Sequence, residues 1–258
     1  MSMRFPQSSA IVPRFVQVDH TGSTNADLRA HAAEVEGWPH LATLVTRDQR
    51  AGRGRLDRTW VAPAGSALAV SVLLRTLPAE PTARGWIPLA AGAAMVKAIG
   101  AQLPGHDVSM KWPNDVLVDA HKICGILAEA TADAVVVGAG VNTEMTREQL
   151  PLPTATSFAA LGAAVDEDLL LSVYLETLDR HLAALTASED AVASGLHGVV
   201  SALCATIGQA VRVSMPAGAV LEGVASSIDA EGRLLVVSDG REHAVSAGDV
   251  VHVRPAGS

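Results

Sequence analysis

The sequence is poor in aromatic residues, although it is not poor in apolar ones. Phe, Trp and Tyr make up 3% of its 258 residues, while hydrophobic residues make up 49%. The core must therefore be built mainly from Ala, Val and Leu, which suit helices packed closely on a sheet. The length allows one sizeable domain, or one domain with a small appendage.

Cysteines and long apolar runs are also scarce. The two cysteines, Cys124 and Cys204, form no disulfide framework and have no metal-ligand spacing. The nine histidines show no H-x-x-x-H or Cys/His pairing, so we expect no zinc site. No run of about eighteen uninterrupted apolar residues occurs, so we expect no helix to span a membrane. The N-terminal residues also lack the long apolar stretch that is typical of a signal peptide. We expect a soluble, cytoplasmic protein with no membrane partner.

Positive charge is in deficit, with 19 Lys and Arg against 27 Asp and Glu. This balance argues against a nucleic-acid partner, since such proteins usually carry a basic face. The stretch QRAGRGRLDRTW (49–60) nevertheless gathers four arginines. Its glycines let the backbone approach a ligand, and arginines bind phosphate or carboxylate with forked donors. We interpret it as a site for a small anion, the alternative being a hydrated turn.

Two further stretches carry polar groups that chemistry could use. In KWPNDVL (111–117), Asp115 could orient an amine, bind Mg²⁺ or cap a turn. In HKICGILAEA (121–130), Lys122 either extends to solvent or places a charge beside a carboxylate or phosphate. Gly125 leaves room for a ligand or a close backbone.

The apolar periodicity predicts the secondary structure. Helices are expected over 23–35, with Ser23 or Thr24 as N-cap, and over 85–103 and 168–187. Strands are expected over 41–46, 66–74 and 134–143, and two strand pieces within 108–130. From about residue 207, short alternating strands separated by glycine turns predict a small antiparallel barrel. We therefore predict a domain over 1–205 and a second over 206–258.

Taken in order, the motifs GRGRLDRTW, KWPNDVL and KICGILAE, with STN at 23–25 and GAGVN at 138–142, resemble those of biotin protein ligases. The resemblance covers about residues 15–250. It implies an α+β fold: a catalytic domain like that of class II aminoacyl-tRNA synthetases, with a mixed sheet and helices, followed by an SH3-like β-barrel. About twenty residues precede STNADL, too few for the winged helix of the members that repress transcription. The resemblance thus implies a ligase without repressor function.

The activity implied is ATP- and Mg²⁺-dependent conversion of biotin to biotinyl-5′-AMP. Biotin then passes to one lysine of a biotin carboxyl carrier domain of acetyl-CoA or another acyl-CoA carboxylase. A lipoate or octanoate ligase is the nearest alternative, and a non-enzymatic biotin sensor or nucleic-acid regulator is the second.

The resemblance also implies roles for single residues. Catalytic roles fall on Arg53, Arg55, Lys122 and Asp115, and Asp115 orients either the acceptor lysine or a metal. Contacts to biotin or its adenylate fall on Ser23, Thr24, Asn25, Gln49, Gly52, Arg53, Gly54, Arg55, Trp60, Lys122 and Gly125, and contacts to the nucleotide on Arg58, Asn114 and Asn142. No metal ligands are assigned. Asp57 stands where the family usually has glycine, and we expect the loop around it to be disordered until biotin or the adenylate orders it.

Overall fold

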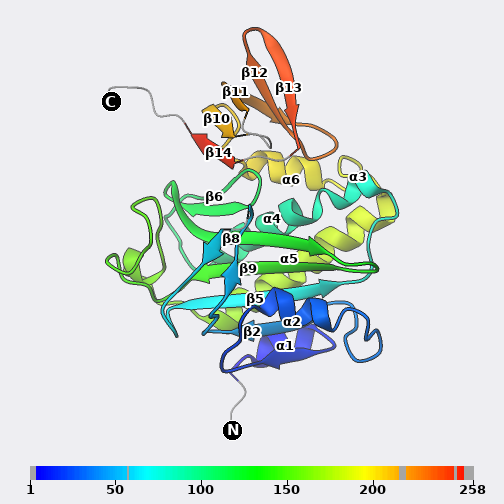
Figure 1. The fold of residues 1–258 in the computed structure, drawn as a ribbon, viewed down its shortest axis with the longest axis vertical. Helices are drawn as coiled ribbons and strands as arrows, with labels where there is room; N and C mark the ends of the chain where they lie inside the picture. The colour runs from blue at the N-terminus through cyan, green and yellow to red at the C-terminus, as the bar shows by residue number, and fades with distance from the viewer. Residues whose placement is uncertain (1–3, 57, 215–218, 247–248, 253–258) are drawn as a thin grey trace.

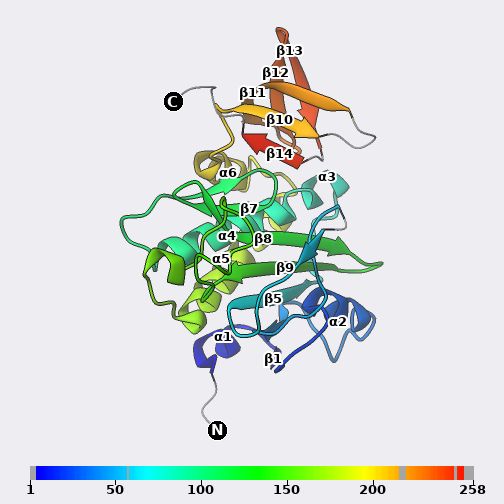
Figure 2. The same cartoon turned by 60° about the vertical axis from the view of Figure 1, so that its left-hand side comes forward.

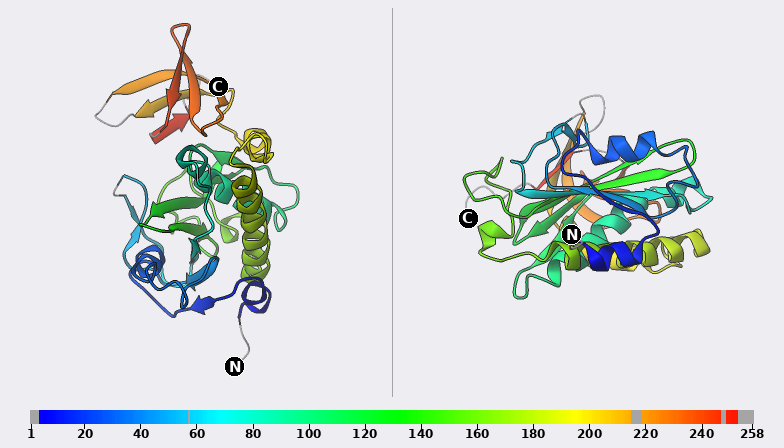
Figure 3. Two further views of the ribbon diagram at one scale, coloured as in Figure 1. Left: turned by 90° about the vertical axis from the view of Figure 1, so that its right-hand side faces the viewer. Right: turned by 90° about the horizontal axis from the view of Figure 1, so that it is seen from below.

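The protein consists of a seven-stranded sheet with helices on both faces and a second, smaller sheet at the C-terminal end (Figure 1). The computed structural model describes residues 4–56, 58–214, 219–246 and 249–252. Helices α1, α4 and α5 lie on one face of the large sheet and α2 lies on the other (Figure 3). The small sheet stands beyond α6, at the opposite end of the molecule from the N-terminus (Figure 2).

The helices among the described residues are α1 (Pro6–Ile11), α2 (Thr24–Ala30), α3 (Pro81–Arg84), α4 (Ile87–Gly100), α5 (Glu167–Ser188) and α6 (Leu196–Leu203), with a 3₁₀ turn at Ala159–Leu161. The large sheet runs in the order β1 (Phe15–Gln17), β2 (Ala42–Thr46), β5 (Ala67–Leu74), β9 (Val135–Asn142), β8 (His121–Ala130), β7 (Asp115–Val118) and β6 (Val108–Lys111). Strand β1 pairs with β2 in parallel, and the other neighbours are antiparallel. The expected α+β fold with a mixed sheet is confirmed.

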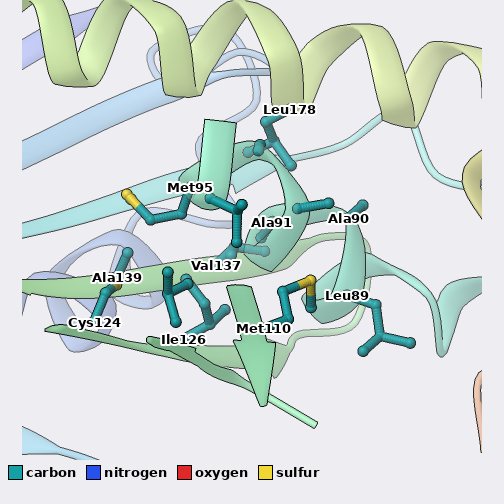
Figure 4. Close-up of a cluster of buried hydrophobic side chains, with 14 of the residues drawn as sticks. Leu89, Ala90, Ala91, Met95, Met110, Cys124, Ile126, Val137, Ala139 and Leu178 are labelled. Atoms are coloured by element: carbon teal, nitrogen blue, oxygen red, sulfur yellow. The ribbon is translucent and has the colours of Figure 1, made fainter. Parts of the chain in front are cut away.

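The face of the sheet under α4 is apolar and closely packed, because α4 is rich in alanine. Val137 and Ile126 point at this helix, and Met110 enters the space that Gly92 leaves open (Figure 4). A Cβ on Gly92 would come within 2.6 Å of the Met110 methyl carbon. Small side chains thus let helix and sheet approach closely, as the composition predicted.

Two of the expected elements differ from the structure. Helix α2 ends at Ala30 rather than at 35, because the chain turns to bury Trp38 beside Leu28, and this tertiary packing outweighs helix propensity. Segment 108–130 forms three strands rather than two. Pro113 cannot donate a ladder hydrogen bond, so the chain turns there and separates β6 from β7.

The small sheet has the order β13 (Arg241–Val245), β12 (Leu234–Ser238), β11 (Val220–Ile228), β10 (Ala210–Ser214) and β14 (Asp249–His252), all antiparallel. Its end strands β13 and β14 do not pair with each other in the residues described, so the expected barrel is not closed. The predicted division between residues 205 and 206 falls between α6 and β10 and remains a prediction. No described helix is both long and apolar enough to pass through a lipid bilayer.

Candidate active site

The floor of the site is a row of small residues across the face of the sheet opposite α4. Asp115, Gly125, Gly140 and Ala69 are cross-strand partners on β7, β8, β9 and β5. Since side chains alternate along a strand, these residues point away from the helix-covered core that Ile126 enters. Because Gly125 and Gly140 have no side chain and Ala69 has only a methyl group, the strands in the middle of the sheet do not cover their own backbone on this face.

Two side chains lie directly on this bare backbone. A Cβ on Gly140 would come within 2.8 Å of the Trp60 indole, and one on Gly138 would collide with the amide of Asn25. Only glycine lets these groups lie so close to β9. Trp60 comes from β4 (Thr59–Trp60), which forms a two-stranded hairpin with β3 (Gly52–Arg53). The arginine stretch thus folds back as a hairpin over the sheet.

A network of neutral hydrogen bonds joins the start of α2 to the sheet. Ser23 is the N-cap, and its hydroxyl accepts from the amide of Ala26 at 3.4 Å. The backbone N–H and hydroxyl of Thr24 donate to the Gln49 side-chain oxygen, at 2.9 and 3.1 Å. The Ser71 hydroxyl lies 2.7 Å from the Thr24 hydroxyl. Hydroxyl and amide groups from three separate segments of the chain therefore meet at the start of α2.

Cationic side chains approach from two different segments. Lys122 Nζ lies 2.6 Å from Asp115 Oδ1. Asp115 is the cross-strand partner of Gly125. Arg55 Nη1 donates to Asn114 Oδ1 at 3.1 Å. The hairpin and the β7–β8 pair thus bring their charges to the same end of the floor.

Glu129 ends the motif KICGILAE but was assigned no role from the sequence, and it supports the site without lining its cavity. Its carboxylate accepts from Arg53 at 3.1 Å, from Arg29 at 2.8 Å and from the Asn25 amide at 2.8 Å. Glu129 therefore ties the hairpin to α2 and to the sheet. Its spacing in the sequence indicates this position. Residues 125, 127 and 129 share one face of β8, so the carboxylate of Glu129 points to the side of the sheet that carries the cavity.

The predicted residues line one cavity of about 330 Å³, with one exception. Gly52 is not among the lining residues, because it packs against the Trp60 backbone and the Gln49 side chain. The predicted residues that do line the cavity are Ser23, Thr24, Asn25, Gln49, Arg53, Gly54, Arg55, Arg58, Trp60, Asn114, Asp115, Lys122, Gly125 and Asn142. The Asn142 amide donates to the carbonyl of Thr156 at 2.9 Å. Asp57 lies outside the described residues.

A second cavity, of about 580 Å³, lies at the other end of β8 and β9, around the turn that joins them. Its two arginines are already engaged, since Arg75 and Arg84 donate to backbone carbonyls. It contains none of the predicted residues. Size alone therefore does not identify the site, and the smaller cavity is the candidate.

Thiol and metal chemistry receive little support from the described residues. Burial raises the pKa of the Cys124 thiol to about 12, so the thiol is neutral at physiological pH and a poor nucleophile. No group of three or more His, Cys, Asp or Glu side chains within the described ranges could hold a metal ion by itself. Asp115 is the one carboxylate among the described residues that line the cavity.

The mixed seven-stranded sheet, the small C-terminal sheet and the cavity lined by cationic side chains define an α+β protein with a candidate ligand site on the large sheet. The sequence pattern of the Biotin/lipoate A/B protein ligase family matches residues 18–142, and that of the biotin protein ligase C-terminal domain matches residues 206–253. The chain is 39% identical to the biotin–[acetyl-CoA-carboxylase] ligase of Mycobacterium tuberculosis, over 92% of this chain and 88% of that protein. The chain belongs to the biotin protein ligase family, and the resemblance drawn from its motifs is confirmed.

Solved structures agree on the fold. The biotin protein ligase of Aquifex aeolicus, in complex with biotin and ATP, matches with a TM-score of 0.75 at 22% identity and covers 95% of this chain and 100% of that one. The biotin protein ligase of Leishmania major, in complex with biotinyl-5-AMP, matches with a TM-score of 0.59 at 22% identity, over 92% and 100% of the two chains.

Proposed function

We propose that the protein activates biotin with ATP and transfers it to a lysine of a carrier protein. The biotin carboxylate attacks the α-phosphate of ATP, pyrophosphate leaves, and biotinyl-5′-AMP forms. The amine of the acceptor lysine then attacks the acyl carbon, AMP leaves, and the amine loses a proton. The observation that carries this proposal is the meeting of cations from two segments, the arginine hairpin and β8, beside the neutral hydrogen-bonding groups of α2.

The first step brings two anions together, so its barrier is largely electrostatic. Lys122 and Arg55 supply fixed positive charge at the carboxylate–phosphate junction, and Arg53 supplies more from the hairpin. Asp115 and Asn114 hold the first two cations in place before the substrates arrive. Charges that are held in place before the substrates arrive lower the barrier, because they need no rearrangement during the reaction.

The cavity suits biotin in size and in polarity. Its volume of about 330 Å³ lies in the range of ligand pockets. Apolar walls come from Leu127 and Leu152, and polar groups from Thr24 and Gln49. We assign the apolar part to the fused rings and chain of biotin, and the hydroxyl and amide groups to its ureido ring.

Magnesium fits this site only together with the nucleotide. Mg²⁺ in nucleotide-dependent enzymes is held by one or two carboxylates plus substrate phosphates, and Asp115 offers one carboxylate at the cavity. When bound, the ion would neutralise phosphate charge.

Asp115 has a second role in the proposal, in the transfer step. Its carboxylate already holds one ammonium group, that of Lys122, at 2.6 Å. An acceptor lysine arriving at the cavity would find the same kind of partner there. We assign Asp115 to orienting that amine and drawing off its proton.

The acceptor in this proposal is the biotin carrier domain of an acyl-CoA carboxylase, in the cytoplasm. The support is the M. tuberculosis relative, whose name specifies acetyl-CoA carboxylase. Recombinant carrier domain incubated with the protein, biotin and ATP should gain one biotin on a single lysine.

ATP–pyrophosphate exchange tests the proposal and separates it from its closest rival. Labelled pyrophosphate should enter ATP when biotin is present and not when lipoate replaces it. Exchange that is absent with biotin, or equally fast with lipoate, would overturn the proposal.

A further inference from the structure

The C-terminal sheet is fixed to the catalytic domain by two tryptophans that bind one turn. The turn, residues 229–233, joins β11 to β12. The indole N–H of Trp86 donates to the carbonyl of Ala230 at 2.8 Å, and that of Trp112 donates to the carbonyl of Gly232 at 3.0 Å. Both indoles are buried, with exposed fractions of 0% and 2%.

The turn is also held by hydrogen bonds of its own. The Asp229 carboxylate accepts from the amides of Glu231 and Arg233, each at 2.9 Å, and from the Arg233 guanidinium. Gly232 has a φ of +80°, which glycine adopts at little cost. The carbonyls therefore stand in fixed positions for the two indoles.

Trp112 has a second hydrogen bond to the chain that leads into the small sheet. Its backbone N–H donates to the Thr206 hydroxyl at 3.0 Å, and Thr206 is fully buried. The same hydroxyl lies 3.2 Å from Nε2 of His252 on β14. Nearby, the amide of Ala205 donates to the carbonyl of Met110 at 2.8 Å. Backbone and side chain of Trp112 are thus both held by residues at or beyond the predicted boundary.

The two tryptophans lead into different parts of the catalytic domain. Trp112 leads, after one proline, into Asn114 and Asp115, which hold Arg55 and Lys122 at the cavity. Trp86 leads into α4, whose buried residues pack on the opposite face of the sheet. One indole is therefore connected to the charged groups of the site, while the other anchors the same turn without that connection.

We propose that the C-terminal sheet positions the Asn114–Asp115 turn through Trp112, and thereby sets the places of Arg55 and Lys122. The inference rests on the proposed function, because it assigns these two cations to adenylate formation. Trp112 is a positioning residue: it touches no reacting atom and acts through its neighbours. A small displacement of charged groups is costly, since a shift of about 1 Å in an active site can reduce the rate about a hundredfold.

The matched variants Trp112→Phe and Trp86→Phe test the proposal. Each removes one indole N–H bound to the same turn and leaves an aromatic ring. We expect both to lower the melting temperature. Biotin-dependent ATP–pyrophosphate exchange should fall about ten- to a hundredfold in kcat for Trp112→Phe alone. Equal exchange rates in the two folded variants would overturn the proposal.

A second pair keeps the test decisive if Trp112→Phe does not fold. Thr206→Val removes the hydroxyl that accepts from the Trp112 N–H, whereas Thr206→Ser keeps a hydroxyl at this position. Exchange should fall in the valine variant and return in the serine variant, and equal rates in both would count against positioning. Failure of the proposed function would look different, because the unmodified protein would then show no biotin-dependent exchange.

Discussion

The two faces of the seven-stranded sheet differ most at its centre, beyond the apolar cluster that α2 covers. Under α4 and α5, Val137 and Leu178 are fully buried among apolar neighbours. On the other face, the same central strands carry Gly125 and Gly140, with polar and charged groups above them. Side-chain volume thus stabilises one face, while its absence makes room for ligands on the other. Substitutions on the ligand face should therefore lower activity, and substitutions on the helix-covered face should lower the free energy of unfolding.

The largest effect is expected at Lys122, on the ligand face. Removing one preorganised charge from such a site typically costs about 10²–10³ in rate. Lys122→Ala should therefore reduce biotin-dependent pyrophosphate exchange by about that factor, with the urea midpoint little changed. Lys97→Ala, on the exposed side of α4, is the control and should exchange at the native rate. Comparable losses in both variants would refute the role of Lys122.

On the helix-covered face the expected effect is on stability. Leu178 of α5 is fully buried, and truncation of such a leucine to alanine costs about 2–5 kcal/mol of unfolding free energy. Urea denaturation of Leu178→Ala should show this loss, while exchange per folded molecule stays native. Leu169→Ala changes the same helix at a residue that is 36% exposed and should cost much less. A marked loss of exchange in folded Leu178→Ala would break the distinction between the faces.

The smallest and most selective effect is expected at Asp115. Asp115→Asn keeps the shape of the side chain but removes the charge that we assign to orienting the acceptor amine. Transfer to the carrier should slow on the order of 10²-fold, and adenylate formation should slow less. Single-turnover measurements of the two steps separate them. Asp119→Asn, at the other end of β7, should leave both steps unchanged, and equal losses of both steps in Asp115→Asn would remove its assigned role in transfer.

Much of the lining of the candidate cavity could be predicted from the sequence, because its motifs are local. The arginine hairpin, the Asn114–Asp115 turn and the Lys122 strand are each contiguous, and the structure gathers them around one cavity. Glu129 was missed because its importance depends on Arg53 and Arg29, partners from distant segments. No single motif contains that information.

The fold was predictable to a similar degree and for a similar reason. Apolar periodicity located α4, α5 and the central strands to within a few residues. It failed at the end of α2, where the position of Trp38 decides the outcome, and at Pro113, where one residue divides a strand pattern. The small sheet was expected from the alternation of apolar and polar residues along its strands. Whether its end strands β13 and β14 pair depends on the curvature of the sheet, which this alternation does not encode.

The bare stretch of backbone in the middle of the large sheet limits how the ligand space could be altered. A side chain added to Gly138 or Gly140 would displace Asn25 or Trp60 rather than line the cavity. Any narrowing or widening must therefore come from the surrounding walls, which are the hairpin, the start of α2 and the segment around Leu152. Variants that accept enlarged or shortened biotin analogues should accordingly map to these walls and leave the central strands untouched.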